Sequence, residues 1–382
     1  MKKGCCARRF RTILEGMIRF DNRPVGSGAP CLLVAELGTS HQGDLDRARE
    51  LIDAAVGAGA ECVKFQLVHA EEILHPRAGS VPLPSGNVPL FDQFKALERG
   101  AEFYAALKQY TEAAGALFLC SPFGIRSARE LRDLGCKALK IASPELNHFP
   151  LLEEVTAYGL PLFLSSGVSL LGDIERALAV TGRERVVLLH CITSYPAPEE
   201  EYNVAVLGSL RRVFGVPAGL SDHSLDPVLV PALAAIHGAC VVEKHFTRSR
   251  ADPGLDDPIA LDPTDFRRMV DAVRRAEADG PVKALKWLNK EYGAGRVTAV
   301  SGTGVKALAA SEEANYDRTN RSLHAAHEIA AGARIAAEDV AVLRTEKVLR
   351  PGIRPEFLRI VVGATARRRI PDGEGIEWAD LL

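Results

Sequence analysis

The sequence predicts an α/β protein: a closed (β/α)8 barrel of the TIM type, followed by a small mixed domain. Three observations support this prediction. Eight short apolar runs recur up to residue 246, helical patterns separate them, and the character of the sequence changes after residue 281. The chain of 382 residues also exceeds the size at which a single hydrophobic core keeps growing, so a second domain is expected.

Each of the eight runs is apolar on successive residues rather than on alternate ones. Parallel strands that are covered on both faces show this pattern, whereas a strand with one solvated face alternates. The runs are also rich in β-branched residues, which favour strands. We therefore predict eight parallel strands, over residues 31–37, 62–66, 116–121, 138–143, 162–166, 186–191, 218–223 and 241–246.

The segments between these runs carry helix signals. Asp44 can cap a helix whose apolar residues, from Leu45 to Ala55, recur at helical spacing. Eight strand-then-helix units favour a closed barrel over an open doubly wound sheet. The open sheet would also need a glycine-rich phosphate turn after its first strand, and AELGTSHQG (35–43) lacks GxGxxG. Similar helical patterns cover residues 127–135, 151–159 and 171–180.

One insertion and four segments complete the predicted organisation. Residues 68–100 are too rich in proline and glycine for a plain helix and too long for a plain loop, so we expect a lid over the barrel mouth. Because Met17 is a suitable start, residues 1–16 are expected to be disordered or a spurious extension. The segments are an N-terminal extension (1–29), the barrel (30–294), a linker (295–317) and the small domain (318–382).

Composition argues against several classes of partner. The net charge of −2 gives no electrostatic case for nucleic acid. No apolar run approaches the roughly 20 residues that cross a bilayer, so we expect a cytoplasmic protein without a membrane partner. Most of the eight cysteines lie in apolar runs and no CxxC spacing occurs, which indicates buried thiols in a reducing compartment. The pair Cys5–Cys6, beside basic residues, would alternatively suit lipidation.

Polar and ionisable residues end nearly every predicted strand. A parallel barrel gathers the carboxyl ends of its strands around one mouth, where its active site lies. Because an unpaired buried charge is costly, these groups must meet one another, a metal or an anionic ligand. One such residue alone is typical of an ion pair, but together they predict an active site. They are Glu36, Lys64, Gln66, Ser121, Lys140, Ser143, Glu145, Ser165, Tyr195, Ser221, His223, Glu243 and His245.

Two histidines, His223 and His245, close consecutive strands. Neighbouring strands lie about 4.8 Å apart, so both imidazoles can reach one divalent ion. Asp256 lies in the loop after the second histidine and is a candidate third ligand. Nitrogen and oxygen ligands without thiolates favour Mn²⁺ or Mg²⁺, with Zn²⁺ as a further candidate. The alternative is a pair of structural histidines.

The basic and hydroxyl side chains predict an anion-binding cradle. Lys64 and Lys140 supply positive charge, and serine hydroxyls supply further donors, a combination that suits phosphate or carboxylate. For any single serine, ordinary capping of a strand end is the alternative. With a metal to polarise a carbonyl and carboxylates to move protons, the site is suited to forming or breaking a carbon–carbon bond. The serines are Ser121, Ser143, Ser165 and Ser221.

Several sequence blocks resemble the N-acetylneuraminate (sialic acid) synthase family. They include VAELGTSHQGDLDRARELIDAAVGAGAECVKFQ, FLCSPF, LKIASPE, LLHCITSYPAP, GLSDHS and EKHFT, in the family's order. RSLHAAHEIAAGARIAAEDV is similar to the antifreeze-like (SAF) domain of those synthases. The resemblance implies a barrel that condenses phosphoenolpyruvate with an amino-sugar aldehyde and releases phosphate. It also implies a homodimer in which each small domain caps the partner's barrel.

The resemblance assigns roles position by position. Glu36 matches the family's acid/base glutamate, with Glu243 in reserve, and His223 and His245 match its metal ligands. Arg321 matches an arginine that the capping domain brings to the partner's acceptor pocket. Residues around phosphoenolpyruvate are matched by Lys64, Lys140, Ser143, Ser165 and Ser121, and residues near the acceptor by Gln66, Tyr195 and Asp256.

The acceptor itself stays open, because this chain departs from the family pattern at three places on the acceptor side. They are residues 40–43 (SHQG), Ser143-Pro144-Glu145 and Thr193-Ser194. Precursors of legionaminic or pseudaminic acid are alternatives to N-acetylmannosamine. A 6-phosphorylated N-acetylmannosamine would need a basic cluster, for which only Arg77 and Arg126 are evident. A non-catalytic carbohydrate-binding or ice-binding protein is the alternative from another class, and it leaves the strand-end residues unexplained.

Overall fold

The computed structural model describes residues 16–83, 86–346 and 348–382. Its main sheet has eight parallel strands in the order β7-β4-β3-β12-β11-β10-β9-β8, and the end strands β7 and β8 lie against each other. This confirms the predicted TIM-type barrel. The strands are β3 (Leu32–Gly38), β4 (Cys62–Leu67), β7 (Leu117–Pro122), β8 (Leu139–Ile141), β9 (Leu162–Ser165), β10 (Val186–Cys191), β11 (Ala218–Asp222) and β12 (Val241–His245).

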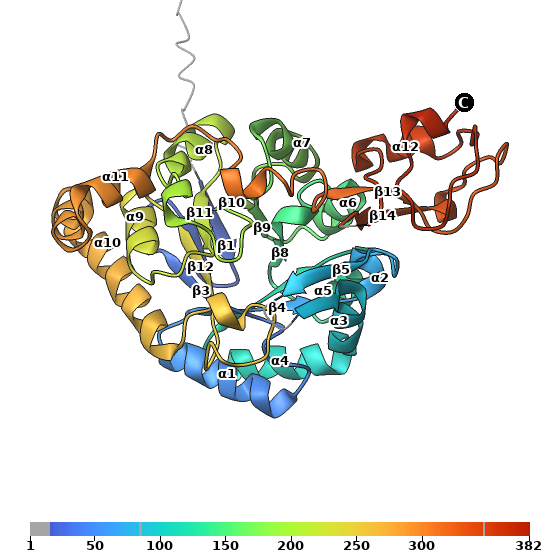
Figure 1. The fold of residues 1–382 in the computed structure, drawn as a ribbon. Coiled ribbons are helices and arrows are strands. Elements are labelled where there is room, and N and C mark those ends of the chain that lie inside the picture. The colour runs from blue at the N-terminus through green and yellow to red at the C-terminus, as the bar shows by residue number, and fades with distance from the viewer. Residues whose placement is uncertain (1–15, 84–85, 347) are drawn as a thin grey trace, which may run out of the picture.

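Helices surround this sheet (Figure 1). Asp44 caps α1 as predicted, because its carboxylate accepts a hydrogen bond from the backbone N–H of Arg47. The long helix α10 is interrupted at Gly280, whose φ of 68° lies in the left-handed region, and at Pro281. The helices are α1 (Leu45–Gly57), α4 (Ala101–Ala113), α5 (Ile125–Asp133), α6 (Phe149–Ala157), α7 (Leu171–Thr181), α8 (Val206–Phe214), α9 (Leu229–Ile236), α10 (Pro263–Tyr292) and α11 (Ala294–Ser301).

Both faces of the barrel strands are buried, which explains their continuous apolar sequences. In β10, Leu188 packs in the large cluster under the helices, whereas the next residue, Leu189, belongs to a second cluster inside the barrel. In β3, Leu33 and Val34 divide in the same way. Alternate residues of one strand therefore pack into two different apolar cores, so neither face of the strand is exposed to solvent.

An antiparallel hairpin, β1 (Met17–Phe20) and β2 (Arg23–Gly26), precedes the barrel. Its residues Ile18, Phe20 and Val25 are buried in the cluster inside the barrel. The prediction of residues 1–29 as a mere extension is therefore wrong for this hairpin, which adds apolar side chains to the barrel core. Residues 1–15, including Cys5 and Cys6, lie outside the described residues.

The insertion predicted as a lid folds into two short helices and a hairpin. They are α2 (Ala70–Ile73), β5 (Ser80–Leu83), β6 (Gly86–Pro89) and α3 (Leu90–Leu97). Phe94 of α3 lines the cavity at the barrel mouth, so the insertion does cover part of this end.

The small domain has its own apolar core, which includes Leu323, Ile335 and Ile376. It is built on the antiparallel pair β13 (Arg321–Ala325) and β14 (Val340–Arg344), followed by α12 (Leu358–Val361). It lies beside α6 and the insertion of its own barrel, at the right of Figure 1 in orange and red. The start of the predicted linker, at residue 295, falls inside helix α11.

The six described cysteines are buried and free, as predicted for thiols in apolar strands. Across the described ranges, every helix is too short or too polar to cross a bilayer.

Candidate active site

A cavity of about 220 Å³ lies at the carboxyl ends of the barrel strands. Residues from β3, β4, β10, β11 and β12 and from the loops that follow the strands converge on it. Most of the residues predicted from the strand ends line this one cavity. They are Glu36, Lys64, Gln66, Lys140, Ser143, Ser165, Tyr195, Ser221, His223, Glu243, His245 and Asp256.

A buried ammonium group joins two carboxylates at the centre of the cavity. Lys64 Nζ lies 2.9 Å from Glu36 Oε2 and 3.3 Å from Glu243 Oε1. Burial opposes the charge of Lys64, but Glu243 and Glu36 outweigh it and raise the pKa of the amine. Burial likewise opposes the charge of Glu243, yet Lys140 and Lys64 hold the pKa of that carboxyl at about 2. Both groups are therefore ionised at neutral pH.

Lys140 has weaker partners than Lys64. Its Nζ is 3.8 Å from Glu243 Oε1 and donates one 3.3 Å hydrogen bond to the carbonyl of Ile141. Burial lowers the pKa of Lys140, and Glu243 offsets this effect only in part. The hydroxyl of Ser165 is also buried without a hydrogen-bond partner. A buried cation and an unpaired donor beside the same cavity are suited to an incoming anion.

The two predicted metal ligands face each other. The ring centroids of His223 and His245 are 5.4 Å apart, and Tyr195 stacks on His223 at 4.2 Å. Nδ1 of His223 lies 2.7 Å from the carbonyl of Ile192 and carries a proton. Burial opposes the charge of His223, but Cys191 and this carbonyl outweigh it and raise the pKa of the ring to about 9, so Nε2 becomes a metal ligand only after it loses its proton. Burial lowers the pKa of His245 to about 3, which keeps this ring neutral.

The residues that fit a metal ion are the two histidines, His223 and His245. In the described parts of the chain, no cluster of three or more His, Cys, Asp or Glu side chains is arranged to hold an ion. Asp256, the predicted third ligand, lies 3.7 Å from His245 Nδ1. Two imidazole ligands would leave the remaining positions of an ion to water and substrate oxygens, as an open catalytic site requires.

Gln66 and the predicted acid/base residue are in direct contact. Gln66 Nε2 donates a 2.6 Å hydrogen bond to Glu36 Oε1, while the other oxygen of Glu36 faces Lys64. On the opposite side, the hydroxyl of Ser221 donates to Glu243 Oε1 at 3.0 Å. Each carboxylate is therefore held by one neutral donor in addition to the shared lysine.

Three predicted site residues do not line the cavity. Ser121 ends β7 beside Gln66, and its buried hydroxyl has no hydrogen-bond partner. Glu145 and Arg321 instead form an ion pair of 2.8 Å whose side chains are both fully buried. Within this chain the guanidinium of Arg321 also donates to barrel carbonyls, including that of Phe123, and its entry into a partner's pocket stays a prediction.

The small domain contributes a different arginine to the cavity. Arg344, at the end of β14, lines the cavity and donates to Glu145 Oε1 through Nε at 3.2 Å and Nη2 at 2.8 Å. Its guanidinium also lies 5.5 Å from the centre of the Phe123 ring. Sequence reasoning missed Arg344, because VAVLRT carries no signal that distinguishes this arginine from a solvated one. Further lining residues that were missed are Thr39, Phe94, Cys191, Thr193, Leu255 and Thr319.

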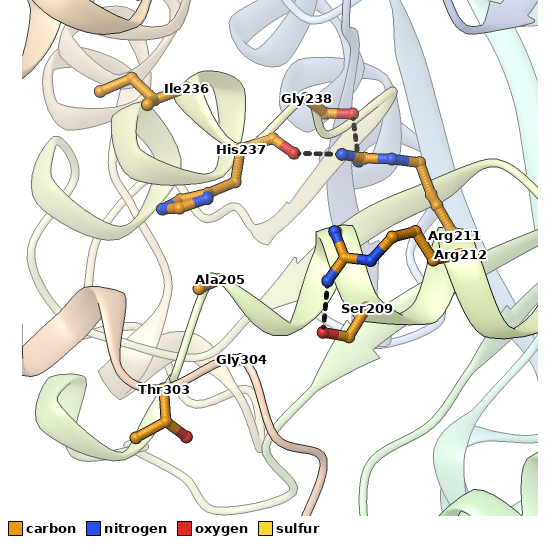
Figure 2. A pocket seen from close by; sticks show the side chains of 10 residues that line it. Ala205, Ser209, Arg211, Arg212, Ile236, His237, Gly238, Thr303 and Gly304 are labelled. Carbon is orange, nitrogen blue, oxygen red and sulfur yellow. Dashed lines mark hydrogen bonds between the residues drawn. The ribbon is translucent and has the colours of Figure 1, made fainter.

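A second hollow lies between α8, the C-terminal end of α9 and Thr303 (Figure 2). Arg211 donates to the carbonyls of His237 and Gly238, which cap α9, and Arg212 donates to Ser209. Of the described residues that line it, none is a carboxylate. The proton-transfer and anion-binding groups are gathered at the barrel mouth instead, so we take that cavity as the candidate active site.

Comparison with known proteins gives the same class as the fold and the cavity, a barrel synthase with a small C-terminal domain. Residues 51–281 match the NeuB family, and residues 320–382 match the SAF domain. The chain therefore belongs to the NeuB family, a family of sialic and nonulosonic acid synthases.

Three relatives cover most of this chain. The spore coat polysaccharide biosynthesis protein SpsE of Bacillus subtilis is 33% identical, over 94% of this chain and 96% of its own. Its crystal structure matches with a TM-score of 0.82 over 96% of this chain and 99% of that one. An N,N'-diacetyllegionaminic acid synthase of Legionella pneumophila is 31% identical (94% and 97% covered). The human N-acetylneuraminate-9-phosphate synthase is 30% identical (69% and 75% covered).

Proposed function

We propose that this protein condenses phosphoenolpyruvate with an unphosphorylated N-acylated amino-sugar aldehyde, such as N-acetylmannosamine, to give a nonulosonic acid and phosphate. The observation that carries the proposal is the composition of one buried cavity. It combines a weakly partnered lysine, a carboxylate pair around a second lysine, and two histidines that face each other. Each of these groups matches one requirement of the reaction: anion binding, proton transfer or polarisation of the aldehyde.

Lys140 and the hydroxyls of Ser143 and Ser165 are assigned to the phosphoenolpyruvate side. Lys140 lacks a close carboxylate, and the Ser165 hydroxyl is unpaired, so a phosphate or carboxylate oxygen would satisfy both. Lys64 also lines the cavity, but its two carboxylates already balance its charge. We therefore expect Lys140 to contribute more to anion affinity, and Lys64 to hold the carboxylates in place.

In the proposed reaction, C3 of phosphoenolpyruvate bonds to the aldehyde carbon of the sugar. Water adds to C2, and the resulting tetrahedral centre loses phosphate by cleavage of its C–O bond. Glu36 is the proposed acid/base residue: it accepts a proton from the attacking water or donates one to the oxygen that becomes the new hydroxyl. Gln66 and Lys64 orient its carboxylate for this role. Glu243 stays ionised beside both lysines and is the reserve.

A divalent ion, Mn²⁺ or Mg²⁺, is proposed as cofactor and would be held by His223 and His245. When bound, it would polarise the aldehyde oxygen of the acceptor. The neutral ring of His245 suits that role, and the binding of an ion by His223 would release its Nε2 proton. Tyr195, which stacks on His223, and Asp256 lie on this side and are assigned to the acceptor.

An unphosphorylated acceptor is favoured by the engagement of the basic residues. Arg77 donates to the carbonyl of Asp372 and Arg126 pairs with Glu130, both outside the cavity lining. Arg344 does line the cavity, but it is already bound to Glu145. Each of these three arginines already has an acidic or carbonyl partner, so none of the three is free to bind a sugar phosphate.

The experiment that tests this function is phosphate release from phosphoenolpyruvate with a panel of acceptors in the presence of Mn²⁺. The panel holds N-acetylmannosamine, its 6-phosphate, and the precursors of legionaminic and pseudaminic acids. Turnover with at least one unphosphorylated amino sugar is expected. Turnover with the 6-phosphate alone would contradict the acceptor assignment, and no phosphate release with any acceptor would contradict the synthase assignment.

A further inference from the structure

Residues 302–320 join α11 to β13, and we call this segment the strap. Two charged side chains of the strap are buried against the barrel. Lys306 is 9% exposed and donates to the carbonyl of Ser166 at 3.0 Å. Glu312 is 1% exposed, and its Oε1 accepts the backbone N–H groups of Val168 and Thr193, each at 2.7 Å. A free linker would not bury such residues, because burial of a charge needs compensating partners.

The strap residues converge on the loop that follows β9, residues 166–169, which we call the β9 loop. Glu312 accepts the N–H of Val168, and Asn320 Nδ2 donates to the carbonyl of the same residue at 3.0 Å. Lys306 binds the preceding turn through Ser166. Three strap side chains therefore bind the carbonyl of Ser166 and both the N–H and the carbonyl of Val168.

The β9 loop has a conformation that its sequence does not favour. Val168 has φ of 41°, in the left-handed region, which β-branched residues rarely adopt. Such a conformation persists only where the surroundings hold it. The loop is also tightly enclosed, since a Cβ on Gly167 would collide with Thr193 and with the hydroxyl of Ser143. The strap supplies the hydrogen bonds that hold Val168 in place.

This loop borders the active-site cavity. Ser165, directly before it, lines the cavity, and Ser143 accepts the N–H of Gly167 at 3.0 Å through its hydroxyl oxygen. Thr193, the other residue that Glu312 binds, lines the cavity as well. Glu312 thus links the loops after β9 and β10, although it does not itself line the cavity.

We propose that Glu312 is a positioning residue for the phosphoenolpyruvate side of the site, and that the strap holds the β9 loop in the conformation this side needs. The inference rests on the proposed function for its choice of substrate. Without the Glu312 carboxylate, Val168 relaxes to negative φ, and the loop withdraws the Ser143 and Ser165 hydroxyls from the anion. On the acceptor side only the N–H of Thr193 loses its bond to Glu312, whereas Tyr195 and Asp256 keep their contacts with His223 and His245.

The test compares the full-length Glu312→Ala protein with a matched control, Ser311→Ala. Ser311 is the neighbouring strap residue, and its hydroxyl binds Glu201, away from the cavity lining. Glu312→Ala should raise KM for phosphoenolpyruvate about tenfold or more, with less than a threefold change for the amino sugar. Ser311→Ala should change both by less than twofold. Equal KM values in folded Glu312→Ala and the parent would overturn the proposal.

A rescue experiment distinguishes a loss of positioning of the β9 loop from a general loss of structure. Val168→Gly adopts positive φ without restraint, so in the Glu312→Ala background it should recover at least half of the loss on a logarithmic scale. Failure to recover would overturn the role of the strained loop. If Glu312→Ala does not fold, Glu312→Gln, which keeps an acceptor for both amides, takes its place. Its KM for phosphoenolpyruvate should rise at least threefold, and an unchanged value would count against the proposal.

Hydrogen exchange gives a readout that needs no activity. In Glu312→Ala, peptides that contain Val168 and Thr193 should exchange faster, whereas in Ser311→Ala they should match the parent. Unchanged exchange would overturn the holding role whether or not the protein is a synthase. A parent protein that releases no phosphate would instead contradict the proposed function, so the two failures are distinguishable.

Discussion

Replacing Lys140 by methionine should separate anion binding from stability. Lys140 is 2% exposed, its nearest carboxylate oxygen is 3.8 Å away, and burial lowers the pKa of its amine. Lys140 helps to keep Glu243 ionised, but its own charge is poorly compensated, so its removal should cost the folded protein less than removal of Lys64. Methionine has a similar length and no charge to desolvate, so the free energy of unfolding should fall by less than about 1 kcal/mol or should rise.

The loss should appear in catalysis instead. One charge-assisted contact to an anion contributes about 2–3 kcal/mol, so kcat/KM for phosphoenolpyruvate should fall roughly 30- to 150-fold. Lys64→Met is the matched control, since Lys64 holds two carboxylates at 2.9 and 3.3 Å. Removing this partner leaves buried charges unpaired, which typically costs about 3–5 kcal/mol. Lys64→Met should thus lose stability as well as activity.

Three measurements decide between these expectations: phosphate-release kinetics, urea unfolding, and calorimetric titration with phosphoenolpyruvate. A ligand at 100 times its Kd stabilises a protein by about 2.7 kcal/mol, and a 30- to 150-fold higher Kd in Lys140→Met should reduce this stabilisation to about 0.3–0.9 kcal/mol at the same concentration. An unchanged Kd in Lys140→Met would refute the anion assignment. A loss of stability as large as that of Lys64→Met would show that Lys140 is mainly a structural residue.

Three further predictions concern the metal, the pH dependence of stability, and whether the small domain caps the barrel of its own chain or that of a partner. Chelation by EDTA should abolish turnover, and Mn²⁺ or Mg²⁺ should restore it except in His223→Ala; full activity of the metal-free protein would contradict the metal site. Burial lowers the pKa of His324 from 6.5 to about 4, so the unfolded chain binds a proton that the folded chain does not. The free energy of unfolding should therefore fall below pH 6.5, by about 2 kcal/mol at pH 5 from this residue, and an unchanged pH slope in His324→Asn would contradict this. Because Arg344 binds Glu145 of its own barrel, mixing Arg344→Ala with Glu36→Ala chains should not regenerate activity; recovery would reveal the swapped homodimer.

The barrel could be predicted because each strand carries its own local signal. Residues such as Leu188 and Leu189 are both apolar, since one faces the helices and the other the inside of the barrel. The hairpin at 17–26 was missed, although Ile18 and Phe20 alternate with exposed residues as in a strand with one buried face. Its sequence is short, and nothing local indicates that the end of a barrel will cover it.

The candidate site also contains both residues that the sequence could predict and residues that it could not. Residues at strand ends, such as Lys64 and His245, could be predicted, because the barrel topology itself brings strand ends together. Arg344, Glu145 and Glu312 could not, since their surroundings depend on where the small domain and the strap lie. The contacts of Arg321 were missed for the same reason: its position at the domain boundary suggested a reach into a partner, and nothing local indicated its ion pair with Glu145.

The charge balance of the cavity connects the metal to phosphoenolpyruvate. The ammonium groups of Lys64 and Lys140 cancel the carboxylates of Glu36 and Glu243 before any ligand binds. A phosphate ester carries about −1.5 to −2 at neutral pH, and the carboxylate of phosphoenolpyruvate adds one more negative charge. Arg344 is shared with Glu145, and protonated His223, whose pKa is raised to about 9, adds one positive charge, so the ligand still needs a divalent ion or further protons taken up by the site. We therefore expect metal removal to weaken phosphoenolpyruvate binding, and any binding that persists should take up protons, which calorimetry in two buffers of different ionisation enthalpy would detect.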